Sequence, residues 1–393
     1  MRIALCFVLV LWAMAPVGAP AAAGSEKKPF ELVRELQIFQ DQAVLKTKNA
    51  RAEQTERIAK VAAQLTKFDA SLWADPRNAR AAVIYVLSGG DPRVLRKLTG
   101  SGVAFGIDDR LVKGALAYGE RRDAEAIELL DGIDIDSLDR SVGGHVALVR
   151  ALLVAKNDPR KAFALLDRAR IVAPGTIIEE AALRRQAILA ARMGEFDAFE
   201  ALSSQYFRRF SNSIFVRSFE RQFAREVAAG GYTADPKRIA ELERLLRGLP
   251  DVERGETCLA VAEEGIAVAN VEVVRLAGRV AAIDAKSRRL DAMRLMLFEA
   301  AALIVTSDYE QGRTSLRLID KSKLGAREEA LLYAALAVAD AISRPPLLPQ
   351  GTNEASPNEA VAGESADSAI SSVVSDAERA IARVDGLLSE AAR

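Results

Sequence analysis

The chain has 393 residues, enough for two or three average domains or one extended array, and half of them are hydrophobic, which supports a buried core. Its 54 Lys and Arg residues equal its 54 Asp and Glu residues, so no global positive field favours nucleic acid as a partner. One His and two Cys are too few for a His/Cys metal site, a thiol redox pair or a disulfide framework.

The composition also indicates the fold class. Aromatic residues make up only 6% of the chain, Ala, Leu, Arg and Glu dominate, and few stretches alternate between apolar and polar residues. Period-2 alternation is the mark of half-buried strands, so the sequence predicts an all-α fold.

The first 23 residues have the layout of a secretory signal peptide. Arg2 precedes an apolar run from residue 3 to 13, and small residues fill positions 21 to 23. A membrane span needs roughly 20 apolar residues, so we expect cleavage near Ala23, export of the chain and no stable membrane insertion afterwards. Cys258 is then the only thiol, and we expect it to be buried as a small hydrophobe.

Helical periods begin at Phe30. Ile58, Val61, Ala62, Leu65 and Phe68 form one apolar stripe, and Asp75-Pro76 is a typical helix start. Residues 79–87 are apolar enough for a strand, but the Asp-Pro start and the Ala content favour a helix. The glycines between 100 and 106 follow a predicted helix, so they indicate a connector and not a dinucleotide-binding turn.

Turn signals then recur near residues 119, 157 and 194, at intervals in the high thirties. Such a period is typical of stacked helical hairpins, and Ala162, Leu166, Ala169 and Pro174 occupy second-helix positions of a tetratricopeptide-like repeat. Arg150 stands where a small residue is expected, so the repeat is degenerate. We therefore predict a helical-hairpin repeat domain, an α-solenoid, over 24–344.

The array is predicted to continue through helices at 236–246, 258–283, 287–305, 308–319 and 327–342. Residues 345–368 are rich in Ser, Glu, Asn, Ala, Gly and Pro and indicate a disordered linker. Residues 369–393 regain an apolar stripe that predicts one amphipathic helix, which either folds back on the body or docks on a partner. From 345 to 393 the chain has three basic and eight acidic residues, which leaves the body basic.

No catalytic or cofactor motif is found. His145, the single imidazole, precedes an apolar helix, where a partly exposed side chain near a helix start is the simplest interpretation. Phosphate loops and nucleophile elbows are lacking, and adjacent carboxylates such as Glu263 and Glu264 point apart on a helix. We expect no catalytic residues, no cofactor and no metal.

One predicted helix, at 213–229, carries a candidate binding surface. Phe215, Phe219 and Phe223 recur every fourth residue, and Arg217, Arg221 and Arg225 do the same on the opposite side, about 200° away around the helix. Arg208 and Arg209 add to the basic side. Because guanidinium groups suit carboxylates, these arginines are a candidate surface for an acidic partner; a solvated outer face is the alternative.

Residues 73–93, from Trp73 to Arg93, together with the stretch that begins at Phe30, resemble the MotC family of periplasmic motility proteins, over about 30–344. The resemblance implies a periplasmic, non-enzymatic component of the flagellar motor that partners the periplasmic domain of the stator protein MotB and supports rotation. It carries no binding motif residue by residue.

The leading hypothesis is thus a periplasmic adaptor that binds MotB. A general cell-envelope scaffold and a regulator linked to peptidoglycan enzymes are the alternatives. The sequence does not decide whether the protein associates with itself.

Overall fold

The computed structural model describes residues 27–45, 51–281 and 289–343, and in these ranges every regular element is a helix. The predicted signal peptide, linker and C-terminal helix lie outside the described residues. The α-helices are α1 (Pro29–Leu45), α2 (Arg51–Leu65), α3 (Pro76–Leu87), α4 (Arg93–Thr99), α5 (Asp109–Gly119), α6 (Asp123–Asp131), α7 (Arg140–Val154), α8 (Pro159–Val172), α9 (Ile177–Arg192), α10 (Phe196–Phe210), α11 (Val216–Ala229), α12 (Pro236–Arg247), α13 (Asp251–Ala267), α14 (Val271–Ala281), α15 (Arg289–Leu303), α16 (Tyr309–Arg317) and α17 (Ala326–Ser343). The all-α prediction is confirmed.

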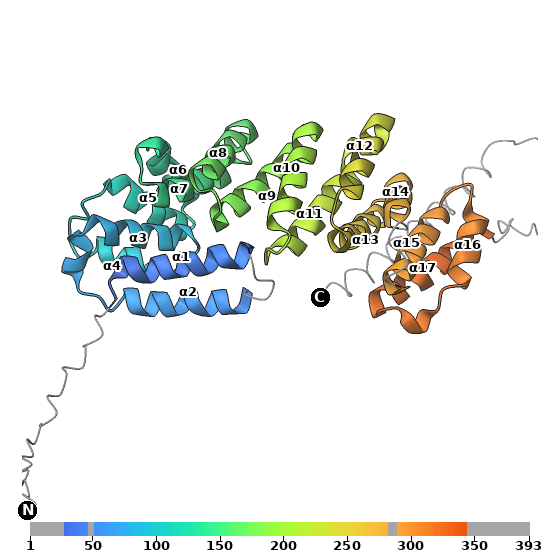
Figure 1. Cartoon of the computed structure of the whole chain (residues 1–393), viewed down its shortest axis with the longest axis horizontal. Helices are drawn as coiled ribbons and strands as arrows, with labels where there is room; N and C mark the ends of the chain where they lie inside the picture. The colour runs from blue at the N-terminus through green and yellow to red at the C-terminus, as the bar shows by residue number, and fades with distance from the viewer. Residues whose placement is uncertain (1–26, 46–50, 282–288, 344–393) are drawn as a thin grey trace, which may run out of the picture.

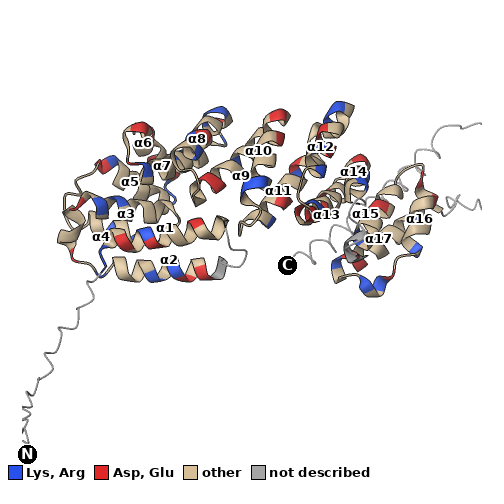
Figure 2. Cartoon of the chain, viewed as in Figure 1, with Lys and Arg blue, Asp and Glu red and all other residues tan. Residues whose placement is uncertain are grey.

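The helices form an elongated row, from α1–α6 at one end to α15–α17 at the other (Figure 1). Helices that follow one another in sequence often pack together, as α5 with α6, α7 with α8, α9 with α10, α13 with α14 and α15 with α16. Basic and acidic residues are mixed along the whole row (Figure 2).

Aspartate side chains start several of these helices, as the Asp-Pro pairs predict. Asp75 accepts a hydrogen bond from the Arg77 amide and starts α3, and Asp158 and Asp235 cap α8 and α12 in the same way. Each cap satisfies an amide that the first turn leaves unpaired, and proline in that turn lacks the amide altogether. Residues 79–87 are therefore helical, as predicted.

Helix α3 is buried on nearly all sides because α1, α5 and α7 all contact it. Its Tyr85 donates a hydrogen bond from the hydroxyl to the Ile58 carbonyl oxygen of α2, and the same hydroxyl accepts one from the Asp91 amide. Burial by these neighbouring helices explains why residues 79–87 form a continuous apolar run, a pattern that would also suit a buried strand. The connector at 100–106 follows α4, and two of its glycines, Gly102 and Gly106, have positive φ.

Helix α1 lies along the row and contacts α9 and α10 as well as its sequence neighbours α2 and α3. The Asp41 carboxylate accepts a hydrogen bond of 2.8 Å from the Ile177 amide at the start of α9. Burial raises the pKa of Asp41, and the hydrogen bond from Ile177 opposes that effect. This long-range packing is not the nearest-neighbour contact that a simple repeat array would show.

The predicted repeat positions of α8 are buried. Ala162, Leu166 and Ala169 pack in one apolar cluster with residues of α7 and α9. Arg150 fits where a small residue was expected because its guanidinium reaches the end of α6, where it donates to the Ile133 carbonyl oxygen at 2.8 Å and to Asp131 at 2.9 Å.

The prediction of one helix over 258–283 is wrong, because the chain turns back between α13 and α14. Ala269 adopts a left-handed φ of 55°, which is rare for a residue with a side chain. The Asn270 side chain donates to the Ala228 carbonyl oxygen at 3.0 Å and accepts from the Val273 amide at 3.3 Å. A tertiary contact with α11 therefore supports a turn that has no glycine or proline. The later helices match their predicted ranges within a few residues.

Candidate partner-binding surface

The candidate surface is built on α10 and α11, which turn into each other over residues 211–215. At this turn the Ser213 hydroxyl accepts a hydrogen bond of 3.0 Å from the Phe215 amide. The predicted helix 213–229 begins at Val216, so Phe215 lies just before its first turn.

The aromatic face of α11 packs into the core, as the spacing predicts. Phe219 and Phe223 are fully buried, and their ring centroids lie 5.2 Å and 5.6 Å from that of Phe207 on α10. Tyr206 lies 4.0 Å from Phe219 between centroids. Phe215 is only partly buried and has the Arg184 guanidinium 5.0 Å above its ring. These rings fix the rotation of α11 and so the direction of its arginines.

The arginine face of α11 meets α13. The Arg217 guanidinium lies 2.9 Å from the Glu256 carboxylate, and that of Arg225 lies 3.5 Å from Glu264. The two carboxylates are spaced by eight residues, as the two arginines are, so the helices match in register. Midway between them, Arg221 corresponds by spacing to the uncharged Ala260.

The remaining two predicted residues lie at the end of α10. The Arg209 guanidinium forms an ion pair of 2.9 Å with Glu179 of α9, whereas Arg208 is exposed. Within the described part of the chain, Arg208 and Arg221 form no ion pair or hydrogen bond with a side chain. The five arginines are thus near one another in the sequence, but three of them already contact carboxylates of this protein.

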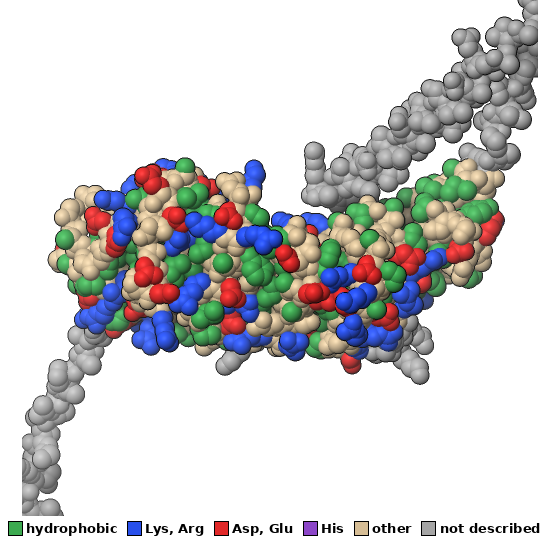
Figure 3. All heavy atoms as spheres, turned by 90° about the horizontal axis from the view of Figure 1, so that it is seen from above, with side chains coloured by type: hydrophobic (Ala, Val, Ile, Leu, Met, Phe, Trp, Pro, Cys, Tyr) green, Lys and Arg blue, Asp and Glu red, His purple; other side chains and the backbone are tan. Residues whose placement is uncertain are grey.

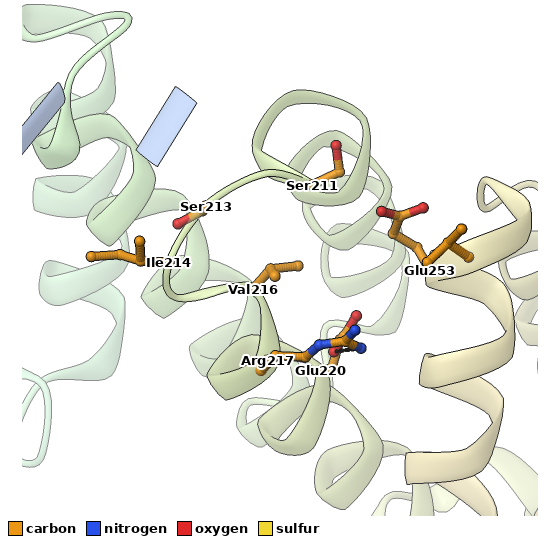
Figure 4. Close-up of a pocket in the computed structure, with 8 residues that line it drawn as sticks. Ser211, Ser213, Ile214, Val216, Arg217, Glu220 and Glu253 are labelled. Atoms are coloured by element: carbon orange, nitrogen blue, oxygen red, sulfur yellow. Dashed lines mark hydrogen bonds and ion pairs between the residues drawn. The ribbon is translucent and has the colours of Figure 1, made fainter. Parts of the chain in front are cut away.

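A pocket of about 250 Å³ opens beside Arg217, between the turn and α13. Arg217 and Glu220 of α11 lie side by side in it, and Glu253 reaches toward it from α13 (Figure 4). The Arg217 guanidinium contacts Glu220 at 3.0 Å while remaining half exposed, whereas the Glu220 side chain is buried. The other residues that line the pocket are Ser211, Ser213, Ile214, Val216 and Val252.

Burial of Glu220 raises its pKa to about 7, although Arg217 opposes that effect. The Glu220 carboxylate is therefore a buried partner of Arg217 and not part of a solvated outer face. In the sequence, only the position of Glu220 next to Phe219 indicated burial. The packing of neighbouring helices over this side of α11 is what buries the carboxylate.

The expectation for His145 is wrong. The side chain is buried in α7, and Nδ1 lies 2.9 Å from the Ser141 carbonyl oxygen. Burial lowers its pKa to about 4. Val142, Val146 and Val149 surround it on the same helix and are all buried, a pattern that predicts a core position. Cys258 is fully buried, as predicted.

The described residues also bear on metal sites and membrane spans. No group of three or more His, Cys, Asp or Glu side chains in these ranges is placed to hold a metal ion. None of the helices described is both long and apolar enough to cross a membrane.

Comparison with known proteins gives two matches. The family model described as "Chemotaxis protein MotC" matches residues 1–393. A protein named Chemotaxis protein MotC from Rhizobium meliloti (strain 1021) is 32% identical over 350 residues, which cover 87% of this chain and 80% of that protein. No solved structure matches the chain.

Proposed function

Since this chain belongs to the MotC family of chemotaxis proteins, we propose that it is a non-enzymatic periplasmic adaptor of the flagellar motor. In this role it binds the periplasmic domain of the stator protein MotB and supports motor rotation. The observation that carries the proposal is the family match, which extends over the whole chain and so includes every helix of the row.

The sequence of the first 23 residues supports the periplasmic location. A charged start, a short apolar run and small residues before position 24 are typical of export by a cleaved signal. Membrane fractionation of cells that express the full chain would test this, with the protein expected in the periplasmic fraction.

The arrangement of the helices supports an adaptor. We interpret the row as an array of degenerate tetratricopeptide-like hairpins, in which pairs such as α7 with α8 and α9 with α10 stack on their neighbours. The buried repeat positions of α8 fit this interpretation. Extended helical arrays offer long surfaces that suit peptides and helices.

The proposed contact is the surface formed by Arg208, Arg209, Arg217, Arg221 and Arg225. Arg208 and Arg221 are exposed and have no carboxylate partner in the described part of the chain. Their charges are therefore not neutralised within the protein and can attract an acidic stretch of MotB. Arg225 has 63% of its side chain exposed, and exposed ion pairs contribute only about 0–1 kcal/mol, so it can exchange partners at little cost. Arg217 is half exposed but is also paired with the buried Glu220, so it is held more firmly.

A binding measurement tests this function. The chain from Gly24 onward is titrated against the purified periplasmic domain of MotB by calorimetry at low and at physiological salt. We expect saturable binding that weakens as salt rises, because charges at the rim of an interface are screened over about 8 Å at 0.15 M.

A second experiment separates the alternatives. Deletion of the gene should stop swimming and leave flagella assembled, and re-expression should restore swimming. Binding to other envelope proteins with none to MotB, and normal swimming of the deletion strain, would favour a general cell-envelope scaffold instead.

A further inference from the structure

Helix α17 is the last described helix of the row and packs mainly against α15 and α16. Its buried residues are Leu332, Ala335 and Ala339, which join the apolar cluster at this end of the molecule. At the start of α17, Arg327 forms an ion pair of 2.8 Å with Glu263 of α13, and Leu331 packs against the central apolar cluster.

The side of α17 that is left open is apolar. Over three turns it carries small or aliphatic residues and no charged one, and it is formed by Ala330, Ala334, Ala337, Val338, Ala341 and Ile342. All of these except the partly buried Ala334 are exposed, and Ile342 exposes 50% of its surface. We call this surface the α17 face.

Exposed apolar side chains are concentrated at this end of the molecule. Of the eleven large hydrophobic side chains that are exposed in the described part of the chain, six lie between Met296 and Ile342. Figure 3 shows hydrophobic side chains gathered over the same end of the row. A patch of this kind at the end of an array marks a surface that another element covers, because end repeats normally present a polar outer side.

We propose that the chain's own C-terminal segment, residues 369–392, lies along the α17 face. The sequence predicts an amphipathic helix for this segment, with Val373, Val374, Ala377, Ile381, Val384 and Leu388 on one side. This stripe covers 16 residues, about 24 Å of helix, and the α17 face covers 13 residues, from Ala330 to Ile342, or about 20 Å. Two apolar stripes of similar length thus occur in one chain.

The tether favours this occupant over a second copy or another protein. Residues 345–368 follow α17 almost directly, and a flexible chain of 24 residues has an end-to-end distance of roughly 27 Å, which matches the length of α17. A linker that matches the span gives an effective concentration in the millimolar range, far above that of a free partner. Small side chains such as Ala337 and Ala341 let a second helix approach closely.

The test uses hydrogen exchange of the α17 amides in the full chain from Gly24 onward. One variant, Ile381→Asp with Val384→Asp, places two charges on the apolar stripe of the segment. The matched control, Ser372→Asp with Ser375→Asp, places the same two charges on its opposite side. Both substitutions lie outside the body, so neither disturbs the folding of α1–α17.

We expect the α17 amides to exchange at least about tenfold faster in the stripe variant than in the unchanged chain, with the control close to the unchanged chain. The protection should be independent of protein concentration, and the chain should sediment as a monomer.

Three results would overturn the proposal. Equal exchange in all three proteins would mean that the segment does not cover the α17 face. Equal acceleration in both variants would mean that added charge alone is responsible. Protection that grows with concentration, together with the mass of a dimer, would assign the face to a second copy of the chain.

Discussion

Substitution of Glu220 by Gln should change how the stability of the protein depends on pH. Burial on α11 raises the pKa of Glu220 to about 7, against 4.5 for an exposed glutamate, although Arg217 lowers it. Between these two values the folded state binds more protons at this site than the unfolded state does. Stability therefore falls as pH rises from about 4.5 to about 7, and it stays at the lower level above that pH.

The size of the effect follows from the two pKa values. At about 1.4 kcal/mol per pH unit, the interval from 4.5 to about 7 corresponds to roughly 3.5 kcal/mol, which is an upper value. Glutamine keeps the shape of the side chain but does not titrate. Relative to the unchanged protein, Glu220→Gln should gain about 2 to 3 kcal/mol in free energy of unfolding between pH 4.5 and pH 8. Urea denaturation followed by circular dichroism at several pH values measures this difference.

His145 offers a comparison with the opposite sign. Burial lowers its pKa to about 4 from 6.5, so the unfolded state binds more protons between these values and stability rises with pH there. His145→Gln should remove that rise, and the effects of the two substitutions should add because the residues lie on different helices. Parallel curves for Glu220→Gln and the unchanged protein would show that Glu220 stays charged in the folded state, with the Arg217 ion pair outweighing burial.

Three further predictions concern the body and the candidate surface. Phe219→Ala should lower the free energy of unfolding by about 3 to 5 kcal/mol, since the ring is fully buried among other aromatic rings, and unchanged urea unfolding would contradict that packing. Arg208→Glu with Arg221→Glu should abolish swimming in a motility assay and weaken MotB binding. The free energy of unfolding should stay within about 0.5 kcal/mol of the unchanged protein, because neither arginine pairs with a described residue. Normal swimming of this variant would contradict the proposed binding surface. Deletion of 345–393 should leave the main thermal transition of the body in place, and its loss in calorimetry would mean that the tail completes the core.

Local features of the sequence determined the helical elements. Asp75-Pro76 and Asp158-Pro159 start α3 and α8 because capping and proline geometry act within one helical turn. The four-residue spacing of Phe219 and Phe223 also settled which side of α11 is buried. Caps and helix periodicity both act along one stretch of chain, so they predict a helix without knowledge of the helices that pack against it.

Other features needed the tertiary structure. The turn at Ala269 has only one local signal, Asn270, whose side chain accepts from the Val273 amide at the start of α14. The left-handed residue before it is supported by the contact between Asn270 and α11. His145 was expected to be partly exposed because the sequence indicated that it lies near a helix start. The sequence did not indicate which helices pack over it, and these bury the side chain.

The candidate surface shows the same division. The sequence by itself determined that Arg217, Arg221 and Arg225 lie on the polar side of one helix, because a residue every 100° fixes their direction relative to the phenylalanines. Only the packing of α13 decided that Arg217 and Arg225 meet Glu256 and Glu264 while Arg221 does not meet a carboxylate. Charges 39 residues apart come together through helix packing, and side-chain periodicity within one helix carries no information about which helix lies opposite.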